Sequence, residues 1–158
     1  MFARQRIRKQ LQGFINPEVV AELQVGQPQR KHFQFVLVLV DESHPEQMPE
    51  VIGRAVDTIL EHQAMLMNIT SSLLVGLLGV PFPQDNSPEA RRGLVDSLLR
   101  ENGDRIKVAH GDCDGAVGNL GSQRRFSYGA LIPRFSGVLK KLLETEFGTA
   151  VEIDVRSL

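Results

Sequence analysis

The stretch FQFVLVLVD, residues 33–41, decides how the chain is built. All of its residues except Gln34 and Asp41 are Phe, Val or Leu, which are strand-forming types. A strand with one face in water would alternate apolar and polar residues, and this run hardly alternates. It therefore predicts a central strand that is buried on both faces and ends at Asp41.

Helical patterns and shorter strands follow this run. Ser87 is placed to cap a helix that begins with Pro88. Gly148 is placed to end the last predicted helix of the chain. Residues 70–72 (Thr, Ser, Ser) interrupt two apolar strands, although tight hairpins favour Gly, Asn or Asp. The predicted helices are 48–62, 88–102 and 133–147, and the predicted strands are 33–41, 64–69, 73–79, 105–111, 115–121, 126–132 and 150–155.

This order of elements predicts an α+β fold with helices packed on an antiparallel-rich sheet around a ferredoxin-like βαββαβ core. Residues 1–30 form a separate lead-in, with a short helix after Asn16 and a linker over 25–31. The basic start of the chain fits a lead-in helix, a transit peptide or a segment beside a membrane. Residues 31–158 form the predicted domain.

Composition excludes several classes of protein. The 158 residues carry 18 basic and 19 acidic side chains, so the net charge of −1 gives no general attraction to nucleic acid. A single cysteine, Cys113, excludes an internal disulfide framework and fits a reducing, cytoplasmic setting. No apolar run approaches the roughly 20 residues that a membrane span requires.

Few residues suggest chemistry on their own. Asp41 is the best-placed acid, because ligands gather at the carboxyl ends of strands in α/β sheets, although a loop cap explains it equally well. Asp112 and Asp114 lie in a D-x-D-G pattern that resembles the start of a calcium loop but lacks its other ligands. A solvated loop between two strands is the favoured interpretation of these two acids.

The sequence resembles the class III adenylate/guanylate cyclase catalytic domain. The segments that carry the resemblance are INPEVVAEL, the buried strand ending in Asp41, ILEHQAMLMNITSSLLVGLLGVPFPQDNSPEA and, most specifically, AVGNLGSQRRFSYGALI. Active members of that family form sites at a dimer interface, where two aspartates hold two divalent metals that activate the ribose hydroxyl. The resemblance implies the cyclase fold over residues 31–158 and pairing as a homodimer or heterodimer.

At most of the positions that the resemblance assigns to the family's site residues, this sequence carries a different residue. Asp41 matches the first metal aspartate, whereas Ser71 stands at the second, and a neutral hydroxyl cannot replace a carboxylate for Mg²⁺. Met67 and Pro133 occupy the positions that recognise the base. Ser136 replaces the catalytic asparagine, and Lys140 replaces the catalytic arginine without its two-pronged geometry.

These differences predict a degenerate cyclase domain that serves as a regulatory or dimerisation module in cyclic-nucleotide signalling and needs no cofactor. The first alternative is an active cyclase that uses ATP or GTP with Mg²⁺ or Mn²⁺, with Asp112 or Asp114 as a metal ligand. A second alternative is a nucleotide-binding sensor without turnover. The simplest alternative is an α+β domain with no ligand.

Overall fold

The computed structural model describes residues 28–158 except 69, 82–84, 123 and 125–126. The chain divides into two compact units. We call residues 32–115 and 132–158 the main unit, and the described residues of 28–31 and 116–131 the hairpin unit. The predicted helix after Asn16 and nearly all of the predicted lead-in over residues 1–30 lie outside the described residues.

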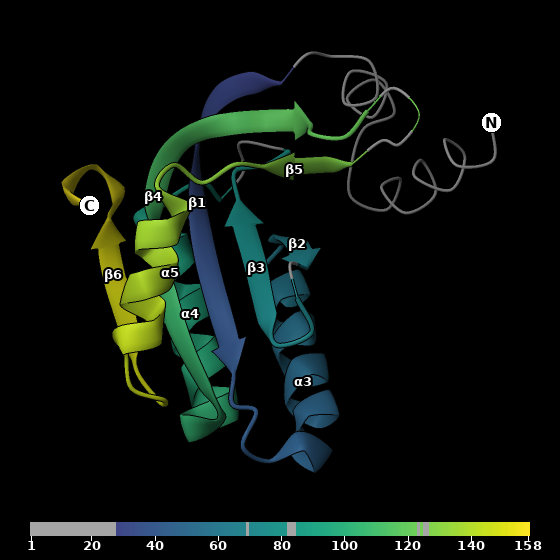
Figure 1. Cartoon of the computed structure of the whole chain (residues 1–158), viewed down its shortest axis with the longest axis vertical. Helices are drawn as coiled ribbons and strands as arrows, with labels where there is room; N and C mark the ends of the chain where they lie inside the picture. Colours follow the sequence, from purple (N-terminus) through teal and green to yellow (C-terminus); the bar gives the residue numbers. More distant parts are fainter. Residues whose placement is uncertain (1–27, 69, 82–84, 123, 125–126) are drawn as a thin grey trace. The chain divides into compact units, whose positions relative to one another are not determined.

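The main unit contains the predicted βαββαβ core (Figure 1). Its sheet has the order β2-β3-β1-β4, in which β3 is antiparallel to both β1 and β2, and β6 is added parallel to β4. The α+β fold class is therefore confirmed. The strands are β1 (Gln29–Val40), β2 (Met65–Asn68), β3 (Leu73–Leu78), β4 (Ile106–Asn119) and β6 (Ala150–Asp154), and the helices are α3 (Met48–Glu61), α4 (Pro88–Asn102) and α5 (Phe135–Glu144).

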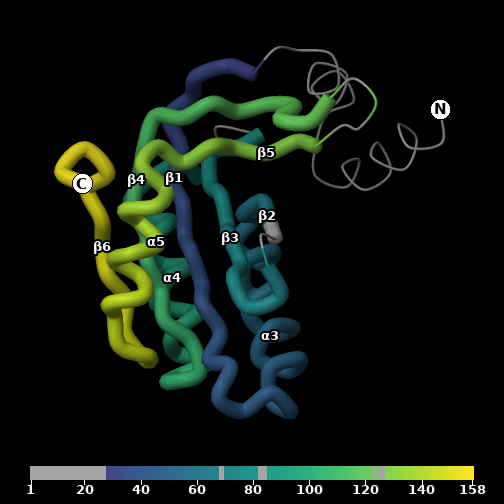
Figure 2. Tube along the Cα trace, viewed as in Figure 1, coloured from purple at the N-terminus to yellow at the C-terminus, as the bar shows by residue number. Residues whose placement is uncertain are grey.

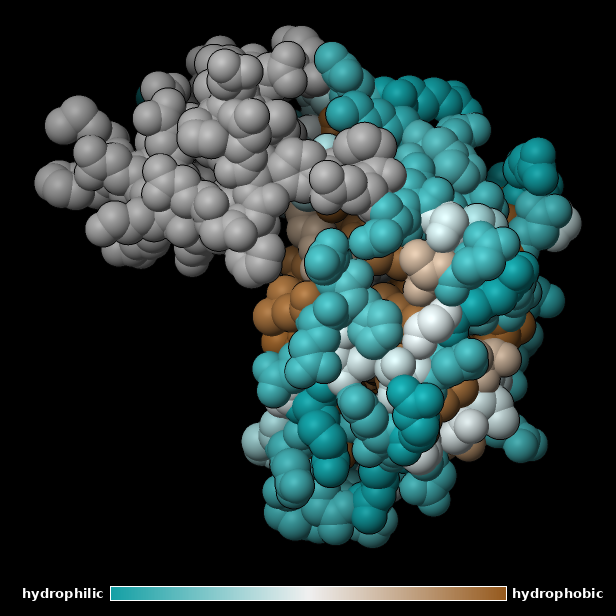
Figure 3. Space-filling view, turned by 180° about the vertical axis from the view of Figure 1, so that it is seen from behind, coloured by the Kyte–Doolittle hydropathy of each residue, from teal (hydrophilic) through white to brown (hydrophobic). Residues whose placement is uncertain are grey.

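Strand β1 is buried on both faces, as its composition predicts. Every side chain from Phe33 to Val38 is at most 1% exposed. Val36, Val38 and Val40 share a hydrophobic cluster with residues of α3 and α4. Alternate residues, including Phe35, point to the opposite face, where α5 lies (Figure 1). The solvent side of α3 and α4 is mostly hydrophilic (Figure 3).

Local capping explains where α4 begins and ends. The Ser87 hydroxyl accepts a hydrogen bond of 3.1 Å from the Ala90 backbone N–H, and Pro88 occupies the first turn. Gly103 follows the last helical residue with a φ of +56°, a conformation that favours glycine. The predicted start and end of this helix are confirmed.

Three apolar side chains that were predicted to face the core from helices are exposed. The helical spacing places Leu60, Leu143 and Phe147 on core-facing stripes, yet these side chains are 43%, 58% and 37% exposed. Leu60 and Leu143 lie at the edges of their apolar stripes, each directly after a buried residue of the same helix. Phe147 lies outside the helix, because α5 ends at Glu144 rather than at the predicted residue 147.

The segment from residue 106 to 119 is one strand, and the predicted acidic loop between two strands is wrong (Figure 2). Asp112 and Asp114 are exposed while Cys113 between them is buried. This alternation has the period of a strand, so the acids face solvent without any turn. The parallel pairing with β6 includes Gly111 with Ile153 and extends to Asp112 with Asp154, so it reaches the first of the two acids.

The hairpin unit consists mainly of the end of β4 and β5 (Tyr128–Ala130), which pair antiparallel from Val117↔Ala130 to Asn119↔Tyr128. Asn119 closes the connecting loop because its side-chain oxygen accepts from the backbone N–H groups of Gly121 and Ser127. The expected strand near residues 126–132 is therefore confirmed in shorter form. The linker expected over 25–31 is wrong from Gln29 onward, because β1 begins there.

None of the described helices is both long enough and apolar enough to cross a lipid bilayer.

Gly111 should tolerate no side chain, because a Cβ atom there would collide with the Ile153 carbonyl oxygen of β6. We expect Gly111→Ala to lower the free energy of unfolding by about 1–3 kcal/mol. Gly53 of α3 is the matched control, because nothing lies within 4 Å of the position that its Cβ would take and alanine favours helix by about 0.5–1 kcal/mol. Urea midpoints of both variants measure the difference; equal destabilisation by the two changes would contradict this packing argument.

Candidate functional site

The end of β1 places Asp41 beside the turn between β2 and β3. The Val40 backbone N–H donates to the Ser72 carbonyl at 2.8 Å, and the Asp41 N–H donates to the Arg105 carbonyl at 2.8 Å. Asp41 therefore lies between the start of β4 and the turn that contains Ser71. These two positions are the ones that the resemblance assigns to the metal pair, and the fold brings them together.

The Thr70 side chain closes this turn. The Thr70 hydroxyl oxygen accepts from the Leu73 N–H at 3.1 Å, and the Thr70 N–H donates to the Leu73 carbonyl at 3.4 Å. Threonine side chains form such local bonds where glycine or asparagine would otherwise set the turn. Ser72 is buried and Ser71 is exposed. The turn is thus held by its own side chain, and Ser71 presents a neutral hydroxyl to solvent.

The Asp41 carboxylate also has a local partner. One oxygen accepts from the Ser43 N–H at 3.0 Å and from the Ser43 hydroxyl at 2.8 Å. These hydrogen bonds, assisted by the nearby charges of His44 and Arg105, lower the pKa of Asp41 below its usual range. Asp41 is therefore an ionised loop cap, with one oxygen engaged in stabilising the loop after β1.

The other predicted site positions lie on β2 and at the start of α5. Met67 lies opposite Val75 on the neighbouring strand and is half-buried. Ser136 and Lys140 are exposed and four residues apart, so they share one side of α5. Pro133 precedes this helix and offers no acid. These side chains present one ammonium group, one hydroxyl and two apolar groups.

Asp112 and Asp114 cannot complete a metal centre with Asp41 in the same chain. Arg105 contacts Asp41 just before β4 begins, and Asp112 lies seven residues further along that strand. At about 3.3 Å per residue the separation is roughly 20 Å, whereas paired catalytic metals lie about 4 Å apart. Both acids instead contact His32.

Across the described part of the chain, no group of three or more His, Cys, Asp or Glu side chains is arranged to hold a metal ion.

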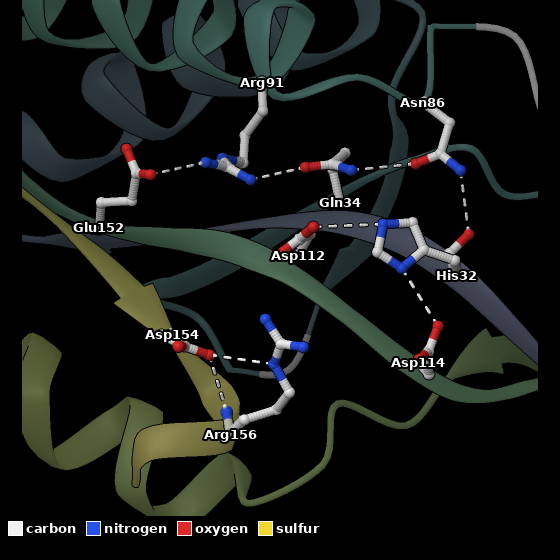
Figure 4. A network of polar contacts seen from close by, with 9 residues as sticks. All are labelled: His32, Gln34, Asn86, Arg91, Asp112, Asp114, Glu152, Asp154 and Arg156. Atoms are coloured by element: carbon white, nitrogen blue, oxygen red, sulfur yellow. Dashed lines mark hydrogen bonds and ion pairs between the residues drawn. The ribbon is translucent and has the colours of Figure 1, made fainter.

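A buried polar network links α4 to the sheet, and sequence reasoning missed it (Figure 4). Arg91 is only 3% exposed. Its Nε donates to His110 Nδ1 at 3.0 Å, its Nη1 donates to Gln34 Oε1 at 2.6 Å, and its Nη2 lies 3.3 Å from Glu152 Oε1. We call these four residues the Arg91 network. Gln34, the one polar residue within an apolar run, is the sequence feature that could have revealed it.

His110 is a neutral acceptor in this network. Burial and the Arg91 charge lower the pKa of His110 to about 4. Because Nδ1 accepts from Arg91, the ring proton is on Nε2. Burial lowers the pKa of Arg91 as well, and the Glu152 carboxylate opposes this. The network therefore compensates a buried charge and serves packing between α4 and strands β1, β4 and β6.

No protein-family model and no curated protein sequence matches the chain. Solved structures do match it. The guanylyl cyclase Cya2 is 17% identical with a TM-score of 0.65, over 79% of this chain and 76% of that one. The adenylyl cyclase CyaB from P. aeruginosa is 12% identical with a TM-score of 0.67, over 80% and 79%.

The chain has the fold of an adenylyl or guanylyl cyclase domain. A bacterial light-regulated adenylyl cyclase gives the same result, with 8% identity and a TM-score of 0.64 over 89% of this chain and 50% of that one. At these identities the cyclase fold is shared while the side chains are largely different.

Removing the Arg91 guanidinium should destabilise this cyclase fold strongly. We expect Arg91→Met to lower the free energy of unfolding by about 2–4 kcal/mol, because Gln34 and His110 would lose buried hydrogen-bond partners. Arg92→Met is the control, because Arg92 is 52% exposed and pairs with the same Glu152. Chemical denaturation distinguishes them; a similar small loss in both would refute a structural role for the buried charge.

The low pKa of His110 should make stability depend on pH. Because the folded protein keeps His110 neutral down to about pH 4, the unfolded chain binds the proton more readily between there and its ordinary value near 6.5. Stability should therefore fall as the pH drops through this window. We expect His110→Gln to remove this part of the decline, as measured by thermal melts at several pH values. An unchanged profile would contradict the assignment.

Proposed function

We propose that this chain is a cyclase-homology domain, spanning residues 31–158 after a lead-in of 1–30, that has lost catalysis. It acts as a regulatory or dimerisation module in cytoplasmic cyclic-nucleotide signalling. The observation that carries the proposal is the turn beside Asp41, which Thr70 closes. Within this turn, Ser71 is the residue that the resemblance aligns with the second metal aspartate. Two-metal chemistry needs anionic ligands there, and a serine hydroxyl supplies none.

The remaining positions support the same conclusion. A single preorganised transition-state donor contributes about 10²–10³ in rate, and both donor positions are altered, to Ser136 and Lys140. Lys140 keeps a positive charge but not the planar fork that binds phosphate in two places. Met67 and Pro133 offer no hydrogen-bond donor or acid to a purine base. Altering several elements that act together leaves little catalysis, although such losses do not simply add.

Loss of a catalytic site leaves the scaffold free to act by association. The similar solved structures are named as cyclases, and the shared fold supports the pairing that the resemblance implies. We propose a homodimer or a heterodimer with a related domain. The parts of the fold that build the core, β1 with α3 and α4, are intact in this chain.

The decisive experiment incubates the purified chain with ATP or GTP and Mn²⁺. We expect no cyclic nucleotide above a protein-free blank. Accumulated product that disappears in Asp41→Ala would establish the active alternative instead. Thermal stabilisation by ATP or GTP without turnover would favour a nucleotide sensor, because a bound ligand stabilises the folded state in proportion to its occupancy.

A variant that adds a carboxylate at the proposed second metal position tests why no cyclic nucleotide is expected. Ser71→Asp should restore a carboxylate beside Asp41, so titration calorimetry should detect Mn²⁺ binding in this variant and not in the wild type. Ser71→Asn is the control of similar size without the charge.

Sedimentation over a range of protein concentrations tests association of the chain, for which we expect a dimer. A monomer at every concentration would rule out the dimerisation module.

A further inference from the structure

The segment that follows β6 lies on the first turn of α5. We call residues 155–158 the strap, which consists of the short 3-10 helix η3 (Val155–Ser157) and Leu158. The Cδ1 atom of Leu158 lies 3.3 Å from the position that a Cβ atom of Gly137 would take. Glycine in the first turn of α5 therefore leaves room for the Leu158 side chain.

Arg134, the residue before α5, connects the strap to the helix. Its Nη1 donates to the carbonyl oxygen of Arg156 at 3.3 Å and also to that of Leu158. Its own carbonyl oxygen accepts from the backbone N–H groups of Gly137 and Val138, at 2.9 and 3.2 Å. The same residue therefore closes the first turn of α5 with its backbone and holds the strap with its side chain.

The backbone of Arg134 has a conformation that residues with side chains rarely adopt. Its φ of +54° and ψ of +38° are left-handed. An arginine side chain accepts no hydrogen bond, so it cannot cap the first N–H groups of the helix. Unfavourable backbone conformations persist where surrounding contacts hold them. The bonds between the Arg134 guanidinium and the strap supply such contacts.

The strap also has internal bonds of its own. The Asp154 side chain accepts from the Arg156 backbone N–H at 3.1 Å and lies 3.5 Å from Arg156 Nε (Figure 4). The Ser157 hydroxyl donates to the Asp154 carbonyl at 2.8 Å. These bonds shape the strap without using any atom of α5. The Arg156 side chain is 94% exposed, so the outer side of the strap faces solvent.

The other end of α5 is attached to the sheet itself. Lys107 of β4 is buried, and its Nζ donates to the carbonyl oxygens of Leu143 and Thr145, at 3.2 and 3.1 Å. The same ammonium lies 4.6 Å from the centre of the Phe147 ring. A cation at a helix C-terminus bonds the last carbonyl groups and matches the helix dipole. The two ends of α5 are therefore held independently, one by a buried side chain and the other by the strap.

We propose that the strap holds the first turn of α5 closed and that displacement of the strap opens this turn. Without the strap, Arg134 relaxes to an ordinary backbone conformation, while Lys107 keeps the C-terminal end of the helix on the sheet. Ser136 lies in the first turn, so displacement of the strap moves this side chain without any contact to it. This device operates whether or not the domain is catalytic.

The first test is amide hydrogen exchange of α5 in the wild type and in Arg134→Gln under identical conditions. The variant loses the bonds from the guanidinium to the strap. We expect the amides of residues 138–140 to exchange roughly three- to ten-fold faster and those of residues 142–144 to keep the wild-type rate. No acceleration at 138–140, or an equal acceleration in both groups, would overturn the proposal.

Arg156→Gln is the matched control for this variant. It removes the same charge from an exposed side chain of the strap but keeps the backbone carbonyl to which Arg134 donates. The exchange rates of the α5 amides should therefore stay at wild-type values. An acceleration as large as that in Arg134→Gln would show that the charge of this region, rather than the attachment of the strap, protects the helix.

A reversible cross-link tests the strap directly. The Cβ atom of Leu158 lies 3.5 Å from the position of a Cβ atom at Gly137, which suits a disulfide bond. In the triple variant Arg134→Gln/Gly137→Cys/Leu158→Cys, oxidation should return the exchange of residues 138–140 toward the wild-type rate, and reduction should restore the fast exchange. Equal rates in the oxidised and reduced forms would refute the role of the strap.

Discussion

Burial of β1 on both faces is the constraint on which the main unit depends. A strand whose consecutive side chains from Phe33 to Val38 all avoid water needs a layer on each side, and α3 and α4 provide one while α5 lies on the other. The same strand must also be paired along both edges, which β3 and β4 accomplish. The position of Asp41 follows directly, because it is the first residue after β1, where the 70–72 turn and the residue before β4 meet.

The neighbourhood of Asp41 shows how a fold and its chemistry can separate. The strand end, the hairpin turn and the residue before β4 are joined by backbone hydrogen bonds that no metal is needed to form. Thr70 supplies the turn closure, and Ser43 occupies an oxygen of the acid. The hairpin turn and one oxygen of the Asp41 carboxylate are thus satisfied from within the chain.

Local features of the sequence predicted local structure well. Ser87 and Pro88 start α4 because capping depends on a few adjacent residues, and β1 is recognisable from composition alone. The prediction of a loop from Asp112 to Asp114 was wrong because a loop and the solvent-facing positions of a strand carry the same polar residues. Pairing with β6, far along the chain, extends to Asp112 and is not visible in the local sequence. The Arg91 network was missed for a related reason, since its members come from four separate elements. The candidate site residues were named from the resemblance to cyclase domains. The fold brings Asp41 and the 70–72 turn together, as that resemblance implies.

The buried guanidinium also has a mechanical meaning. One residue of α4 is bonded to side chains of three different strands, so sliding the helix along the sheet by even one residue, about 1.5 Å, would break all of these bonds together. The Arg91 contacts therefore fix the register of α4 against β1, β4 and β6 at one position.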